Sequence, residues 1–180
     1  MKILALDTST LAASVAIVDG GRVAAEIVDD SGDHSDRLIT VIQNCLAQAS
    51  LTLAEMDAIA IGAGPGSFTG LRIGMATAKG LAFAANKPLW AVSSLAAVAK
   101  QASPAAGIQR IAAVVDARRR EIFVGLFEVG SLNPLTDERV MPPGELASTL
   151  SELGALPDST LIVGDGAKLY PAQVEPCGHI

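Results

Sequence analysis

The segment Gly62-Ala-Gly-Pro-Gly-Ser-Phe-Thr-Gly70 lies between a short apolar run and a long helical pattern. Several glycines at such a junction let backbone amides converge on an anion, so the segment has the shape of a phosphate-binding loop. It does not match the GxxxxGKS/T, GxGxxG or GxSxG motifs. The alternative is a tight turn that caps the following helix through Ser67 or Thr69, and both interpretations stay open.

Two similar polar segments, Asp7-Thr-Ser-Thr10 and Asp116-Ala-Arg-Arg-Arg-Glu121, each follow an apolar run. A carboxylate at a strand end, followed by hydroxyl groups, can hold a metal-bound phosphate, although Asp, Ser and Thr are also common in turns. Arginines 118–120 form the only basic cluster, which suits a solvated hairpin tip, an acidic partner or an RNA phosphate. The candidate anion-binding or nucleotide-binding residues are Asp7, Thr8, Ser9, Gly64, Gly66, Ser67 and Asp116.

The helical pattern behind the glycine segment carries small residues on two faces. One face repeats every four residues, and glycines inside a helix each cost about 1 kcal/mol relative to alanine, so a close neighbour must offset that cost. Two interpretations stay open: the helix is contacted from two sides, by its own sheet and by a partner, or it is buried wholly within its own domain. The first face holds Gly70, Gly74, Ala78 and Ala82, and the second holds Ala76, Gly80 and Ala84.

Other catalytic arrangements find no support in the sequence. His34 and His179 lack the spacing of metal ligands, and Cys45 and Cys177 lie far apart without a CxxC pattern, so neither a metal site nor a disulfide is predicted. No nucleophile and base lie in a recognisable pairing, which argues against a peptidase. Asp7, Asp116 and Asp165 could meet only if the fold brought them together.

Composition narrows the class of protein. The chain has 180 residues, of which 50% are hydrophobic, 18% charged and only 3% aromatic, so it folds into a compact core and offers few rings for stacking on bases. The net charge of −6 repels a phosphate backbone, so tRNA contact is expected to be indirect. No targeting or membrane segment is evident, and we expect a cytoplasmic protein with reduced thiols.

The pattern of elements predicts an α/β protein with two lobes, residues 1–103 and 108–180. Strands at 3–6, 14–18 and 22–28 form an antiparallel meander joined by Asp19-Gly-Gly21, which argues against a plain Rossmann start. A helix over 35–49, capped by Ser35 or Asp36, precedes a strand at 58–62, the helix ending near 85, a strand at 89–92 and a helix over 95–101. Strands at 110–116, 121–127, 135–141 and 160–163, with a helix at 143–153, weakly repeat this order.

These residues together resemble the bacterial TsaB (YeaZ) family. The resemblance rests on Ile3-Leu-Ala-Leu-Asp-Thr-Ser-Thr10, His34-Ser35, Gly64-Pro-Gly-Ser-Phe-Thr-Gly-Leu-Arg-Ile-Gly74 with Ala78-Lys-Gly-Leu81, and Val115-Asp-Ala-Arg118 with Glu121. It covers the chain to about Gly166. The second lobe is expected to be short relative to the family.

The resemblance implies an actin/Hsp70-like (ASKHA) fold, each lobe a mixed sheet that opens with an antiparallel meander and is flanked by helices. It further implies a non-catalytic subunit for threonylcarbamoylation of the tRNA adenosine beside the anticodon. Such a subunit pairs with a TsaD-type transferase, works with a TsaE-type ATPase and forms a homodimer alone. The catalytic relative carries an HxxxH metal motif, which the helix after the glycine segment lacks. The partner interface is expected at Leu38, Ile42, Cys45, Leu46, Ile73, Gly74 and Ala78.

Two other functions remain alternatives. The first is an ATPase or phosphotransferase of the same fold, with Asp7 and Asp116 flanking a metal-nucleotide. The second is a peptidase. Bound cofactors are not expected for the chain alone, although ATP or ADP with magnesium could lie at a partner interface. Nucleotide-binding relatives carry a glycine soon after the first Asp, whereas this chain has Thr8, Ser9 and Thr10 there.

Overall fold

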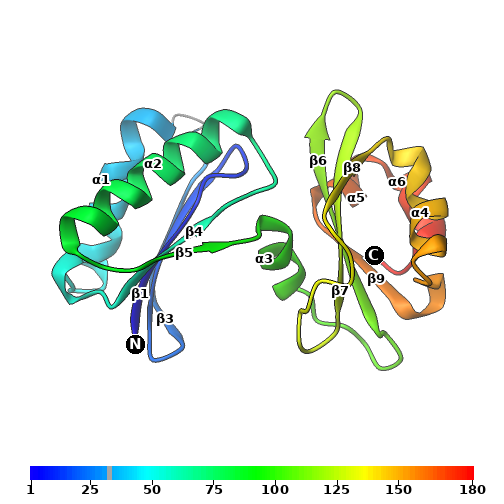
Figure 1. Ribbon diagram of the computed structural model, residues 1–180, viewed down its shortest axis with the longest axis horizontal. Coiled ribbons are helices and arrows are strands. Elements are labelled where there is room, and N and C mark those ends of the chain that lie inside the picture. The colour runs from blue at the N-terminus through cyan, green and yellow to red at the C-terminus, as the bar shows by residue number, and fades with distance from the viewer. Residues whose placement is uncertain (32–33) are drawn as a thin grey trace. The chain divides into compact units, whose positions relative to one another are not determined.

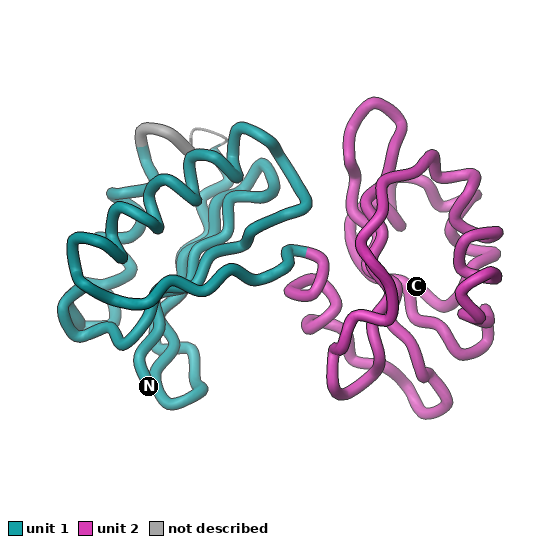
Figure 2. The backbone as a smooth tube through the Cα atoms, in the orientation of Figure 1, with its two compact units in different colours: residues 1–94 teal, residues 95–180 magenta. Residues whose placement is uncertain are grey.

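The computed structural model describes residues 1–31 and 34–180, with side chains outside 32–36, and divides into two compact units. Unit 1 is Met1–Ser94 and unit 2 is Leu95–Ile180 (Figure 2). The division falls at the start of helix α3 (Ser94–Lys100), between Ser94 and Leu95, not at 103–108 as predicted. The reason is packing, because Leu95 and Ala99 of α3 are buried among residues of the second unit's sheet.

Unit 1 is a five-stranded sheet of order β3-β2-β1-β4-β5. Its first three strands, β1 (Lys2–Asp7), β2 (Ala13–Asp19) and β3 (Arg22–Asp29), form the predicted antiparallel meander. Gly20 and Gly21 make its turn at φ values of +57° and +83°. Strands β4 (Ala58–Gly62) and β5 (Leu89–Val92) add in parallel beside β1.

Two helices, α1 (His34–Gln48) and α2 (Phe68–Ala85), lie on one face of this sheet (Figure 1). Alternate strand residues point toward them, as period-two burial requires. The core contains Leu4 and Leu6 of β1, and Ile59 and Ile61 of β4. The expected N-caps of α1, Ser35 and Asp36, lie outside the described side chains.

Unit 2 repeats this plan with strands β6 (Arg110–Arg118), β7 (Glu121–Glu128), β8 (Arg139–Met141) and β9 (Thr160–Val163). Their order is β8-β7-β6-β9, an antiparallel meander with β9 parallel to β6. Outside β9, His179 pairs in parallel with Leu161, in the place that β5 occupies beside β4. The sheet carries helices α4 (Leu146–Glu152), α5 (Asp165–Leu169) and α6 (Pro171–Val174).

The elements predicted from the sequence differ most from the structure in unit 2. The predicted strand 135–141 is only Arg139–Met141, because the chain first makes a separate bridge between Pro134 and Phe127. The predicted helix 143–153 begins as a 3₁₀ turn, Pro143–Glu145, and only then becomes α4. Helices α5 and α6 were not predicted, because each is too short to show a periodic apolar pattern.

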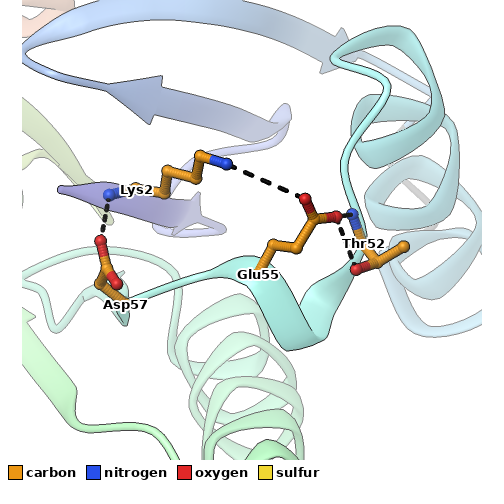
Figure 3. A network of polar contacts seen from close by, with 4 residues as sticks. All are labelled: Lys2, Thr52, Glu55 and Asp57. Carbon is orange, nitrogen blue, oxygen red and sulfur yellow. Dashed lines mark hydrogen bonds and ion pairs between the residues drawn. The ribbon is translucent and has the colours of Figure 1, made fainter.

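A network of hydrogen bonds and an ion pair links the connection between α1 and β4, residues 49–57, to Lys2 at the start of the chain (Figure 3). The Thr52 amide and hydroxyl both donate to Glu55 Oε2 at 2.8 Å, and Lys2 Nζ lies 3.9 Å from Glu55 Oε1. The Lys2 amide donates to Asp57 Oδ2 at 2.7 Å. The hydrogen bonds from Thr52, with a smaller contribution from Lys2, lower the pKa of Glu55.

Replacing Glu55 with Gln should therefore flatten the acid limb of stability. A carboxyl whose pKa is lowered on folding stabilises the protein above its unfolded pKa, and this contribution is lost as pH falls through the folded pKa. We expect the melting temperature of the wild type to exceed that of Glu55→Gln at neutral pH, and the small difference to vanish between pH ~5 and ~3. A difference that stays constant over that pH range would contradict the prediction.

Candidate functional site

The glycine segment between β4 and α2 forms the predicted helix cap. The Gly70 amide donates to Ser67 Oγ at 3.3 Å, which confirms Ser67 as the N-cap of α2. Other amides of the segment also find partners within unit 1: the Ser67 amide donates to the Ser9 carbonyl at 2.6 Å, and the Gly64 amide to Ser94 Oγ at 3.3 Å. The segment is therefore hydrogen-bonded to its own unit, as a structural turn would be.

Four glycines of β4, the segment and α2 allow residues 7–9 to approach closely. A Cβ atom added at Gly62 would meet the Asp7 carboxylate, at Gly66 the Ser9 carbonyl, at Gly70 the Thr8 carbonyl and at Gly74 the Thr8 hydroxyl. The buried Thr8 hydroxyl donates to the Gly70 carbonyl at 2.8 Å. We call this arrangement of Gly62, Gly66, Gly70 and Gly74 against residues 7–9 the glycine clasp. It supplies the close neighbour that the small residues of α2 require.

Asp7 lies at the centre of the clasp and accepts hydrogen bonds from its own chain. Its Oδ1 accepts from the Ser9 amide at 2.8 Å and the Ser9 hydroxyl at 2.6 Å, while Oδ2 accepts from the Ser94 hydroxyl at 3.4 Å. The fold thus brings together every candidate anion-binding residue of unit 1. Because this carboxylate and the amides of Gly64, Ser67 and Gly70 are already paired, the geometry fits a nucleotide phosphate poorly and favours the structural interpretation.

The same local design recurs in unit 2. Asp116 Oδ1 accepts from the Arg118 amide at 3.0 Å, two residues ahead, as Asp7 does from Ser9. The Asp116 amide donates to Asp165 Oδ1 at 3.0 Å, so two of the three candidate aspartates are joined through a backbone amide. Glycine again allows close approach, because a Cβ at Gly164 would meet the Val114 carbonyl. The duplication therefore extends from strand order to side-chain detail.

The predicted interface positions on α1 and α2 point inward. Leu38, Ile42, Cys45, Gly74 and Ala78 are buried in unit 1, and Leu46 and Ile73 are partly buried against its core. This corrects their assignment to an outer surface. Helical spacing showed which residues share a face, but their own sheet, not a partner, covers that face.

The outward face of α2 carries a different set of residues, which we call the outer stripe: Phe68, Arg72, Ala76, Lys79 and Phe83. Phe83 is 90% exposed and Phe68 is 67% exposed. The Arg72 guanidinium carbon lies 3.7 Å from the centre of the Phe68 ring. A hollow of about 450 Å³ beside the stripe is lined by Phe68, Leu71, Arg72, Met75, Ala76 and Lys79, together with Ala63.

The second small-residue face of α2, with Ala76, Gly80 and Ala84, is exposed next to the stripe. The spacing of small residues predicted this second face but not the exposure of Phe68 and Phe83. Two phenylalanines in a chain with only four were a signal that could have located the stripe, since both fall in the α2 pattern. Large exposed rings on one helix indicate a surface that another molecule covers.

The two cysteines are free and buried, Cys45 in unit 1 and Cys177 in unit 2. Burial raises the pKa of both thiols, which disfavours the reactive thiolate. Among the residues that the structure describes, no group of three His, Cys, Asp or Glu side chains could hold a metal ion. No helix within residues 1–31 and 34–180 is long and apolar enough to cross a membrane.

The duplicated sheets and the placing of α1 and α2 define an actin-like (ASKHA) fold. The fold matches the activator of 2-hydroxyisocaproyl-CoA dehydratase from Clostridium difficile with a TM-score of 0.51 at 13% identity, over 84% of this chain and 53% of that one. The confirmed fold class is thus α/β with two mixed sheets flanked by helices.

Sequence comparison is more specific. A family model described as "TsaD: tRNA N6-adenosine threonylcarbamoyltransferase" matches residues 20–160. The tRNA threonylcarbamoyladenosine biosynthesis protein TsaB of Escherichia coli is 35% identical, over 96% of this chain and 82% of that protein. YeaZ from Pseudomonas aeruginosa is 40% identical with a TM-score of 0.71, over 79% of this chain and 67% of that one. This chain belongs to the TsaB (YeaZ) family, as its motifs indicated.

Proposed function

We propose that this protein is a non-catalytic subunit for threonylcarbamoylation of tRNA and that it pairs with a TsaD-type transferase through the outer stripe. The observation that carries the proposal is the exposure of Phe68 and Phe83 on one face of α2. Aromatic side chains and arginine are enriched where proteins associate, and Arg72 stacked on Phe68 supplies both at one point. The family membership supplies the pathway.

The match to a transferase family model supports a partner of like fold. Two chains with the same helix pair can associate face to face, and a second copy of this chain can take the partner's place in a two-fold interface. We therefore propose that the homodimer and the heterodimer use the same stripe. A TsaE-type ATPase is a further proposed member of the complex. The ATP or ADP with magnesium expected at a partner interface stays a prediction.

The internal pairing of Asp7 supports the non-catalytic assignment. Both of its carboxylate oxygens accept hydrogen bonds from side chains or amides of unit 1, and the glycine clasp places backbone carbonyls against the segment where a phosphate would have to lie. This arrangement argues against the ATPase alternative. We therefore propose that the protein acts by positioning its partner.

Light scattering during gel filtration tests the proposal. We expect the protein alone to elute as a homodimer and to form a heterodimer when mixed with the transferase subunit, with loss of the homodimer. Exchange of one for the other would follow from a shared stripe, because the same surface cannot bind two partners at once. A protein that stays unchanged in mass on mixing with the transferase would contradict the pairing.

A further inference from the structure

The tip of the β6–β7 hairpin holds three successive arginines in an unfavourable backbone conformation. Arg118, Arg119 and Arg120 have φ values of +67°, +51° and +65°. Arg118 lies opposite Glu121 in the antiparallel register of β6 and β7, which leaves Arg119 and Arg120 as the two central residues of a tight turn. Such turns favour Asn-Gly, because residues with a Cβ rarely adopt positive φ. Arginine at both positions is therefore a poor choice for the turn itself.

Packing does not account for these arginines. All three side chains are exposed, and only Arg118 is held, by Asp116, whose Oδ2 lies 3.6 Å from the Arg118 Nε atom. Within the described residues, Arg119 and Arg120 take part in no recorded ion pair or hydrogen bond. The nearby acidic groups, Asp116, Glu121 and Asp165, lie at the base of the turn, where Asp116 and Asp165 bind backbone amides.

The placing of the tip suits contact with a large anion. In Figure 1 the β6–β7 hairpin extends past the helices of unit 2. The chain as a whole has a net charge of −6, which keeps a polyanion away from most of its surface. A projecting pair of cations can reach phosphates while the acidic body stays at a distance. Guanidinium groups bind phosphate oxygens through paired, directional hydrogen bonds.

We propose that Arg119 and Arg120 contact backbone phosphates of the tRNA when this chain is part of the transferase complex. The inference rests on the proposed function, which brings a tRNA to the complex, and goes beyond the indirect role expected from composition. An RNA backbone is favoured over an acidic protein surface because the proposed function already supplies that polyanion. In addition, phosphate contacts do not depend on the base sequence of the tRNA.

The test replaces Arg119 with Asn and Arg120 with Gly, which gives the turn its preferred residues. We expect this double variant to be at least as heat-stable as the wild type, so a loss of binding cannot be ascribed to unfolding. An unmodified tRNA transcript is titrated into the complex with the transferase at several salt concentrations. Two lost phosphate contacts should reduce the slope of log affinity against log salt by roughly 1.5.

The control variant, Arg139→Gln with Lys168→Gln, removes two exposed cations from elsewhere in unit 2. We expect it to keep the wild-type slope. An unchanged slope in the tip variant, or an equal reduction in the control, would overturn the tip contact. Loss of the heterodimer in the tip variant would point to an acidic protein partner and would also overturn it.

Complex formation is measured first by light scattering, which separates the two hypotheses. If the wild type itself forms no heterodimer, the proposed function fails, and titration of the tRNA transcript into the chain alone then decides the tip contact. In that case salt-dependent binding that the tip variant weakens supports the contact, and absence of binding overturns it.

Discussion

Replacing Gly70 with Ala should destabilise unit 1 by about 2 kcal/mol or more, whereas Gly80→Ala in the same helix should stabilise it by up to about 1 kcal/mol. An added Cβ at Gly70 would meet the Thr8 backbone carbonyl, which cannot rotate away. At Gly80 there is nothing within 4 Å, so only the improved helix propensity remains. The same substitution in one helix therefore has opposite signs.

The sole tryptophan, Trp90, lies on β5 and reports the unfolding of unit 1. In urea its fluorescence transition should shift downward by about 1 M for Gly70→Ala, given a typical denaturant dependence of roughly 1–3 kcal/mol per M. The Gly80→Ala transition should shift slightly upward. A Gly70→Ala protein with the stability of Gly80→Ala would show that the glycine clasp is not a tight contact.

A further pair of variants separates the parts of the clasp. The Cβ of Gly74→Ala would meet the Thr8 hydroxyl, so removing that hydroxyl with Thr8→Ala should partly restore the stability of the double variant. The same Thr8→Ala change should not rescue Gly70→Ala, because the Thr8 carbonyl is unchanged. The changes in unfolding free energy should therefore be non-additive for Gly74→Ala with Thr8→Ala and additive for Gly70→Ala with Thr8→Ala, since coupling requires direct contact between the changed groups.

The second large effect is expected for association: Phe83→Glu should weaken the heterodimer by at least ~30-fold, which corresponds to ~2 kcal/mol for an aromatic anchor. The ring is 90% exposed and makes little contact within unit 1, so folding should be unaffected. A glutamate there would have to be desolvated on binding without a designed partner. The homodimer should be lost together with the heterodimer, because both are proposed to use the outer stripe.

Light scattering and the Trp90 urea transition are measured on the same samples, so association and folding are followed separately. The matched control is Leu169→Glu, which places the same charge on an exposed apolar residue of unit 2. It should associate as the wild type does. Unaltered association of Phe83→Glu, with a normal urea transition, would remove the outer stripe as the interface.

The sequence by itself determined the order of most elements and the family. Alternating apolar residues and the Asp19-Gly-Gly21 turn specified the opening meander, because register and turn chemistry are local properties. The Gly/Ser-rich segment before α2 similarly encoded its own cap at Ser67. The motif residues that resemble the TsaB family indicate that family without any knowledge of tertiary contacts.

Only the tertiary structure decided which faces are covered. Leu38, Ile42 and Cys45 have the spacing of one helical face, and that spacing is the same whether the face meets a sheet or a partner. The role of the glycines likewise depends on Thr8 and its neighbours, which lie about sixty residues away in the chain. Contacts between distant segments cannot be predicted from a local sequence pattern, so the clasp, the boundary at the start of α3 and the outer stripe required the fold.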